Sequence, residues 1–158
     1  MQALAKVISS GVEHTERLGE YVARTIGTSG AIFLFGDLAA GKTAFVRGFV
    51  RHFSPTVAKD VHSPTYALMN QYQTTLPIYH LDLYRVESWE AFLDLGLAEA
   101  LAEGQTSCIE WPKEWLQPHF NPCLSVHFKH LEDDRRELAF HFCELPKNFD
   151  PKTIEEIV

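Results

Sequence analysis

The sequence predicts a single α/β domain spanning residues 1–158, with a mixed parallel and antiparallel sheet flanked by helices. Three observations lead to this fold class. An apolar run of strand length at residues 31–35 is followed by a glycine-containing loop and then by helical spacing at residues 44–50. Similar strand-length runs are separated by a helical pattern in the middle of the chain. In the last third, apolar residues occur at every second position, which indicates antiparallel strands with one polar face.

The first third of the chain predicts further elements on both sides of this strand, loop and helix. A short edge strand is expected at residues 4–8. A helix is expected at residues 14–26, because its apolar residues fall on one face and Gly27 follows its last turn. Residues 53–64 contain two Ser-Pro pairs and show little periodicity. We therefore expect a mobile connection there rather than a regular element.

The rest of the chain predicts a hairpin, an interrupted helix, a strand and a second hairpin. Ser88 is the expected cap of the helix, and Gly96 interrupts it. The expected ranges, in chain order, are strands at 66–73 and 78–85, helical segments at 89–95 and 97–102, a strand at 106–110, an antiparallel hairpin at 123–143 and a short final helix from Pro151.

Residues 36–43 read Gly-Asp-Leu-Ala-Ala-Gly-Lys-Thr and match the phosphate-binding pattern G-x-x-x-x-G-K-[ST]. In such a loop, backbone N–H groups surround a phosphate, and the following helix directs the positive end of its dipole at the same place. Lys42 would reach the β- and γ-phosphates, while the Thr43 hydroxyl would bind Mg²⁺. A glycine turn that only joins a strand to a helix would explain neither side chain, so the sequence predicts a P-loop NTPase-like domain. The residues expected to contact the nucleotide here are Gly36, Asp37, Leu38, Ala39, Ala40, Gly41, Lys42, Thr43 and Ala44.

Two strand-like runs carry carboxylates that are candidates for holding Mg²⁺, since acidic ligands in such domains lie at strand ends near the loop. In the first run, alternation places His80, Asp82 and Tyr84 on one face of the strand. The second run is apolar and ends at Glu110, which stands where a Walker B strand usually has Asp. Both carboxylates have an alternative interpretation. Asp82 would pair with a basic side chain such as Arg85, and Glu110 would be a surface carboxylate at a strand end.

Composition excludes several classes of function. The formal net charge is −7, so the chain lacks the clustered basic charge that would hold a nucleic-acid backbone without a partner. No apolar run approaches membrane-spanning length and the first residues lack a signal-peptide core, so we expect a cytoplasmic protein with no membrane contact. The three cysteines lack C-x-x-C spacing, which predicts reduced core residues rather than a disulfide framework or a zinc site.

Four motifs follow one another in order: the loop at 36–43, Ser-Pro-Thr-Tyr at 63–66, His-Leu-Asp-Leu-Tyr-Arg at 80–85 and Ile-Glu-Trp-Pro at 109–112. In a chain this short, the combination closely resembles the bacterial TsaE (YjeE) family, small P-loop ATPases required for threonylcarbamoyladenosine formation in tRNA. The resemblance extends from the first helix to the final hairpin. One departure is Ala39, where family members usually carry Gly. We expect this loss of backbone freedom to be tolerated.

The resemblance implies roles for the residues that match the motifs. The loop would bind ATP or ADP, and the catalytic residues would be Lys42, Asp82 and Glu110. Thr43 and Glu110 would be the ligands of Mg²⁺, with Asp82 close by as a further ligand or as a holder of water.

Other implied roles concern the neighbourhood of the γ-phosphate and the partners. Ser63 and Thr65 would belong to a switch-like segment near the γ-phosphate, in agreement with the mobile connection expected at 53–64. Trp111 matches a tryptophan beside the metal region, although packing at a strand end explains it equally well. The implied partners are the TsaD and TsaB proteins of the tRNA-modification complex, so the chain would meet tRNA only indirectly. ATP hydrolysis would drive or reset that assembly.

Three alternatives remain open from the sequence. A small-molecule P-loop kinase would need an acceptor pocket and a lid that supplies arginines, and the sequence has no Arg-rich segment of that kind. A GTPase would need an N-K-x-D stretch, which is missing. A module with a purely structural nucleotide would keep Lys42 and Thr43 but would tolerate neutral residues in place of Asp82 and Glu110.

Overall fold

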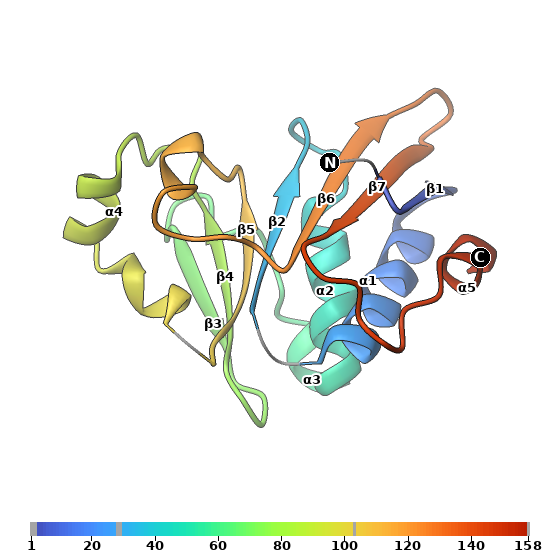
Figure 1. Ribbon diagram of the computed structural model, residues 1–158, viewed down its shortest axis with the longest axis horizontal. Helices are drawn as coiled ribbons and strands as arrows, with labels where there is room; N and C mark the ends of the chain where they lie inside the picture. Colours follow the sequence, from blue (N-terminus) through green and yellow to red (C-terminus); the bar gives the residue numbers. More distant parts are fainter. Residues whose placement is uncertain (1–2, 28–29, 103, 158) are drawn as a thin grey trace.

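The computed structural model, shown in Figure 1, describes residues 3–27, 30–102 and 104–157. The predicted domain at 1–158 thus includes four short stretches, 1–2, 28–29, 103 and 158, that lie outside the described residues. The elements, in chain order, are β1 (Ala5–Ser9), α1 (Val12–Ile26), β2 (Gly30–Phe35), α2 (Lys42–Phe53), α3 (Pro55–Ala58), β3 (Met69–Tyr72), β4 (Ile78–Asp82), α4 (Trp89–Asp94), the 3₁₀ helix η1 (Leu97–Leu101), β5 (Thr106–Glu110), the 3₁₀ helix η2 (Glu114–Leu116), β6 (Leu124–His130), β7 (Arg136–Phe142) and α5 (Pro151–Glu156).

The sheet is mixed parallel and antiparallel, which confirms the predicted fold class. In the described part of the chain its strand order is β1-β7-β6-β2-β5-β4-β3. The central strands β6, β2, β5 and β4 are parallel neighbours. At one edge, β7 runs antiparallel to both β6 and β1. At the other edge, β3 runs antiparallel to β4. The loop at 36–43 follows β2 directly and so leaves the sheet at its centre, at the carboxyl ends of the parallel strands, where α/β sheets bind ligands.

Apolar side chains of the central strands alternate between two cores on opposite faces of the sheet. On β2, Ile32 and Leu34 join the core that includes α1 and α2. Ala31 and Phe33 join the core that includes α4, η1 and η2. Figure 1 shows α1 and α2 side by side on one side of the sheet and α4 on the other. Both faces of the parallel strands are therefore covered, which explains why these strands are apolar along their length.

Helices α1 and α2 touch backbone to backbone, because a glycine of each faces the other helix. A Cβ atom at Gly48 would lie 1.8 Å from the carbonyl oxygen of Glu16, and one at Gly19 would lie 2.1 Å from that of Phe45. The contact is reinforced at its polar side, where Arg51 forms an ion pair of 2.9 Å with Glu16. Since α2 begins at the end of the glycine-containing loop, this contact fixes the helix that carries Lys42.

The expectation of an irregular connection at residues 53–64 is wrong for the four residues of α3. Ser54 caps this helix, since its side chain accepts a hydrogen bond of 3.2 Å from the N–H of Val57. Pro55 occupies the first helical position, where its missing N–H costs nothing. A Ser-Pro pair is thus a helix-start signal as well as a turn signal, and here it starts a helix.

The first predicted hairpin is present, but both of its strands are shorter than predicted. Strand β3 begins at Met69, because a turn around Leu68, with φ of 67°, precedes it. Strand β4 ends at Asp82, whose carboxylate accepts a hydrogen bond of 2.9 Å from the N–H of Tyr84 and so turns the chain. Tyr84 is consequently outside the strand and 58% exposed, rather than on the strand face that carries His80 and Asp82.

The other predicted elements are confirmed. Ser88 caps α4 by accepting a hydrogen bond from the N–H of Ala91, and Gly96, with φ of 73°, separates α4 from η1. The second hairpin and the final helix from Pro151 are also present. In residues 3–27, 30–102 and 104–157, no helix is both long enough and apolar enough to cross a membrane.

The three cysteines are free thiols, but they do not share one environment. Cys108 is buried in the sheet, Cys123 is partly buried, and Cys143 is exposed. The prediction of reduced core residues is therefore wrong for Cys143, which follows the last residue of β7.

The α1–α2 contact predicts a large cost for a methyl group at its centre. Helix propensity alone makes Gly48→Ala favourable by about 1 kcal/mol. Because the added Cβ would meet backbone at Glu16, we expect the free energy of unfolding to fall instead, by about 2 kcal/mol or more. Urea unfolding measures this change, with Arg17→Ala on the exposed face of α1 as a control that should shift stability by less than about 0.5 kcal/mol. A stabilised Gly48→Ala variant would contradict the contact.

Candidate functional site

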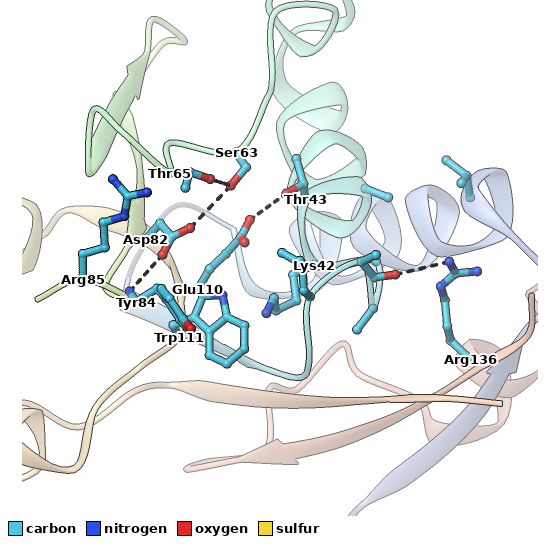
Figure 2. Close-up of a pocket in the computed structure, with 16 residues that line it drawn as sticks. Lys42, Thr43, Ser63, Thr65, Asp82, Tyr84, Arg85, Glu110, Trp111 and Arg136 are labelled. Atoms are coloured by element: carbon cyan, nitrogen blue, oxygen red, sulfur yellow. Dashed lines mark hydrogen bonds between the residues drawn. The ribbon is translucent and has the colours of Figure 1, made fainter.

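A cavity of about 510 Å³ opens where the loop at 36–43 meets the ends of β4 and β5, which is a size suited to a small-molecule ligand. Figure 2 shows its side chains converging from several elements. The residues that line it are Val12, Leu38, Ala39, Ala40, Gly41, Lys42, Thr43, Ala44, Ser63, Thr65, Asp82, Tyr84, Arg85, Glu110, Trp111 and Arg136.

The wall nearest α2 offers backbone donors to an anion. Gly41 is the N-cap of α2 and has φ of 104°, a conformation that favours glycine. Among the described residues, no side chain caps this end of the helix. The first N–H groups of a 12-residue helix therefore lack side-chain acceptors next to the cavity. Together with the helix dipole, they favour a bound negative charge such as phosphate.

Lys42 supplies the cation that lies on the loop itself. Its Nζ donates hydrogen bonds to the carbonyl oxygens of Gly36 (2.5 Å) and Asp37 (3.4 Å), and it lies 3.8 Å from the centre of the Trp111 ring. Burial lowers the pKa of Lys42, while the nearby carboxylates, of which Glu110 acts most strongly, oppose this change. A phosphate beside the ammonium group would favour its charged form in the same way. The environment of Lys42 is therefore suited to an anionic ligand.

The Thr43 hydroxyl donates a hydrogen bond of 2.9 Å to Oε1 of Glu110, as Figure 2 shows. Glu110 is the last residue of β5 and only 3% exposed, so it is not a surface carboxylate. Burial disfavours its charged form, but the favourable interactions with His80, the Thr43 hydroxyl and the Lys42 ammonium outweigh burial, and the pKa of Glu110 is below its usual value. Glu110 is thus a carboxylate at neutral pH. Because the only proton of Thr43 points at Glu110, the lone pairs of the hydroxyl oxygen remain for another ligand.

Asp82 lies beside Glu110 in the register of β4 and β5 and is 4% exposed. One of its oxygens accepts the N–H of Tyr84, and the other faces the Ser63 hydroxyl at 3.5 Å. Ser63 in turn lies 3.0 Å from the hydroxyl of Thr65. The alternative that Asp82 pairs with Arg85 is wrong, since no ion pair joins them in the described residues. The structure thus gathers two carboxylates and two hydroxyls along one wall.

Most residues that the sequence singled out line this cavity. Gly36 and Asp37 do not line it, and instead their carbonyl oxygens hold Lys42. Trp111 lies at the cavity wall against Lys42 and Tyr84, so it does more than fill space at a strand end.

Sequence reasoning missed Val12 and Arg136. Arg136, at the start of β7, donates a hydrogen bond of 3.4 Å to the carbonyl of Ala39, and its Nε is buried without a partner among the described residues. Val12, at the start of α1, is 54% exposed at the cavity. Neither residue lies in a recognisable motif, because the pairing of β7 with distant strands brings Arg136 to the loop.

The donor set fits a nucleotide with Mg²⁺ better than a metal held by protein alone. In the described part of the chain, no three His, Cys, Asp or Glu side chains are grouped to hold a metal ion. Mg²⁺ usually takes one or two protein carboxylates and completes its shell with phosphate oxygens and water. Thr43, Glu110 and Asp82 match that requirement, and the backbone donors and Lys42 would hold the phosphates.

Two residues that line the cavity have left-handed backbone conformations, which residues other than glycine rarely adopt. Ala39 has φ of 62°, and Trp111, which precedes a proline, has φ of 54°. Such conformations cost about 1 to 3 kcal/mol each and persist where the surrounding structure imposes them. Both residues line the cavity, so part of the backbone strain of the described chain lies at the cavity wall.

Comparison with known proteins finds similarity to one family of biosynthesis proteins. A family profile described as "Threonylcarbamoyl adenosine biosynthesis protein TsaE" matches residues 9–138. The tRNA threonylcarbamoyladenosine biosynthesis protein TsaE of Rickettsia bellii is 37% identical over 140 residues, covering 86% of this chain and 94% of the relative. The TsaE proteins of Treponema pallidum and Bacillus subtilis are 31% and 34% identical, and the matches cover 85% and 81% of this chain and 98% and 79% of those proteins.

The fold is also shared with a solved structure. The crystal structure of YdiB from Bacillus subtilis superposes with a TM-score of 0.65 at 25% sequence identity, covering 88% of this chain and 85% of that protein. The mixed sheet and its helices are therefore common to both proteins.

The strain at Ala39 predicts that glycine stabilises the loop. In Ala39→Gly, relief of the left-handed conformation should outweigh the extra entropy that glycine gives the unfolded chain. The free energy of unfolding should then rise by up to about 1 kcal/mol. Ala40→Gly is the matched control, because Ala40 is 1% exposed and is not among the residues with positive φ, so it should lose about 1 kcal/mol. Chemical denaturation of both variants measures the difference. Equal losses would contradict the strain at residue 39.

Proposed function

This chain belongs to the TsaE family, and we propose that it acts in tRNA threonylcarbamoyladenosine biosynthesis as an ATPase that binds Mg-ATP and hydrolyses it to ADP and phosphate. The observation that carries the proposal is the hydrogen bond from Thr43 to the buried carboxylate of Glu110 beside an open helix N-terminus. This hydrogen bond joins Thr43, the last residue of the G-x-x-x-x-G-K-[ST] pattern, to Glu110, the last residue of the parallel strand β5.

In the proposed complex, the loop and Lys42 hold the phosphates. Negative charge moves between phosphate oxygens as the terminal phosphate leaves. The N–H groups at the start of α2 and the Lys42 ammonium stabilise this charge. For this purpose the Nζ of Lys42 would leave the carbonyl oxygens of Gly36 and Asp37 and donate its hydrogen bonds to phosphate oxygens instead. The indole of Trp111 covers the ammonium from the other side and limits the access of water.

Thr43, Glu110 and Asp82 would hold the Mg²⁺ ion. Bound Mg²⁺ supplies positive charge that offsets the growing negative charge on the phosphates. The lone pairs of the Thr43 oxygen would be available to the ion because the hydroxyl proton is donated to Glu110. Glu110 and Asp82, adjacent across β4 and β5, would bind the ion directly or through its water. The oxygen of Asp82 that faces Ser63 would orient the attacking water, with Ser63 and Thr65 near the γ-phosphate.

The proposal includes the TsaD and TsaB proteins as partners, with tRNA contacted only through them. The net charge of −7 supports an indirect contact with RNA. Exposed apolar side chains at the cavity support a protein contact there, with Leu38 at 85% and Tyr84 at 58% exposure.

The experiment that tests the proposal is phosphate release from Mg-ATP by the purified chain, alone and with TsaD, TsaB and tRNA. We expect slow release alone and faster release with the partners. Release that ignores the partners but increases with a small hydroxylated metabolite would instead indicate the kinase alternative.

Removal of the Lys42 ammonium should abolish turnover. We expect Lys42→Ala to lower the rate of phosphate release by about 10²-fold or more, because no other side chain of the loop carries a positive charge. Lys147→Ala, which changes an exposed lysine remote from the cavity, is the matched control and should leave the rate unchanged. Normal turnover in Lys42→Ala would refute the role of the loop.

Neutralisation of Glu110 should separate binding from hydrolysis. Glu110→Gln keeps the shape of the side chain and an oxygen for the Thr43 hydroxyl, but it removes a charge from the proposed metal site. We expect kcat to fall by about 10²-fold while nucleotide still binds, as measured by calorimetry and single-turnover kinetics. The same substitution at the exposed Glu114 serves as the control. If both variants hydrolyse ATP at the rate of the unsubstituted chain, Glu110 has only a structural role.

A further inference from the structure

Next to Glu110, a buried line of polar side chains crosses three strands. His80, on β4, is 0% exposed and is not among the residues that line the cavity. Its Nε2 lies 2.8 Å from Oε1 of Glu110 on β5, and its Nδ1 lies 2.8 Å from the hydroxyl of Tyr72 on β3. Tyr72 is itself 5% exposed. Because these groups are shielded from water, their protons must be shared among themselves and the nearby backbone.

One proton of this line is assigned by counting donors and acceptors. An ionised Glu110 only accepts, so Nε2 of His80 must carry the proton that joins them. The Tyr72 hydroxyl lies within hydrogen-bond distance of the other ring nitrogen, Nδ1. Burial raises the pKa of Tyr72 to about 12, so its hydroxyl keeps its proton at neutral pH.

The backbone carbonyl of His62 completes the count. It lies 3.3 Å from the Tyr72 oxygen, which is longer than the 2.8 Å between Tyr72 and His80. The side-chain amide of Asn70 donates to the same carbonyl at 3.2 Å. The Tyr72 hydroxyl donates to this carbonyl and also lies within hydrogen-bond distance of Nδ1 of His80. Every group in the line therefore has a partner, and the proton between His80 and Glu110 is on Nε2.

We propose that His80 is a positioning residue for Glu110 and that Tyr72 holds the His80 ring with its Nε2–H directed at Glu110. Oε1 of Glu110 is then fixed by two donors, Thr43 at 2.9 Å and His80 at 2.8 Å. Oε2 accepts no hydrogen bond from the described residues and remains for the metal ion or its water. The effect on catalysis rests on the proposed function, whereas the position of the ring and of its Nε2 proton does not.

The same line touches the segment that carries Ser63 and Thr65. The carbonyl of His62, the residue before Ser63, is in contact with Tyr72 and Asn70 on β3. Tyr72 therefore contacts both the His80 ring that orients Glu110 and the residue that precedes Ser63.

The first test locates the proton between His80 and Glu110 and requires no hydrolysis. Long-range ¹H–¹⁵N spectra of the full chain with labelled histidines would report both ring nitrogens of each of the eight histidines, and His80→Gln would identify the signals of His80. We expect a slowly exchanging proton on Nε2. We also expect Tyr72→Phe to shift both nitrogen signals, because it removes the hydroxyl beside Nδ1. A ring without a proton on Nε2, or signals that Tyr72→Phe leaves unchanged, would overturn the proposal.

The second test measures kcat and KM for Mg-ATP in four variants whose folding is checked by thermal unfolding. His80→Leu removes the donor to Glu110, and we expect kcat to fall by about 10- to 100-fold and the Mg²⁺ requirement to rise, with little change in KM. His80→Gln places an amide N–H near the position of Nε2 and should restore most of kcat. Tyr72→Phe should lower kcat by about 3- to 10-fold.

The matched control is Tyr79→Phe. Tyr79 is also a buried tyrosine of this sheet region, but it faces the opposite core and its hydroxyl donates to Glu99. We expect its kcat to remain unchanged. Equal kcat values for Tyr72→Phe and Tyr79→Phe, or a His80→Gln variant no better than His80→Leu, would overturn the catalytic part of the proposal. If the unsubstituted chain released no phosphate, the proposed function would fail and the spectra of the His80 ring alone would decide its role.

Discussion

The parallel register of β4, β5 and β2 determines where the chemistry of this protein lies. Asp82 is paired with Glu110, and Glu110 with Leu34, so the three strands end at one level. The glycine-containing loop leaves β2 just beyond Leu34, which brings Thr43 within hydrogen-bond distance of Glu110. A shift of one residue in this register would turn both carboxylates to the other face of the sheet, away from α2.

The site is polar in a place where the rest of the sheet is apolar. His80, Asp82 and Glu110 are each exposed by 4% or less, and unpaired polar groups at such positions are strongly destabilising. Each has a partner in the structure, and the partners come from four different segments of the chain. These hydrogen bonds hold the polar groups in place before any ligand binds, and electrostatic catalysis requires such preorganised groups. Trp111, with its left-handed backbone, directly follows Glu110.

Local patterns in the sequence account for the strand, loop and helix at residues 31–52 and for both carboxylates. They do so because a phosphate-binding loop and a strand-end acid are encoded by neighbouring residues. Arg136 could not be predicted, since its approach to Ala39 depends on how β7 joins the sheet, and pairing of distant strands leaves no local signal. The helix α3 could have been predicted from Ser54 and its following proline, had the pair been considered as a cap.

The tryptophans divide between two separate environments. Trp111 lies against the Lys42 ammonium at the cavity, whereas Trp89 and Trp115 pack with Phe92 in the core beneath α4, where Trp89 also stacks on His119 at 3.9 Å. Ultraviolet emission from this chain is therefore the sum of one indole beside the loop at 36–43 and two indoles on the opposite face of the sheet. A change in charge at the loop alters the first contribution, and loosening of the second core alters the other two. The protein thus carries separate optical reporters for its ligand site and for its packing.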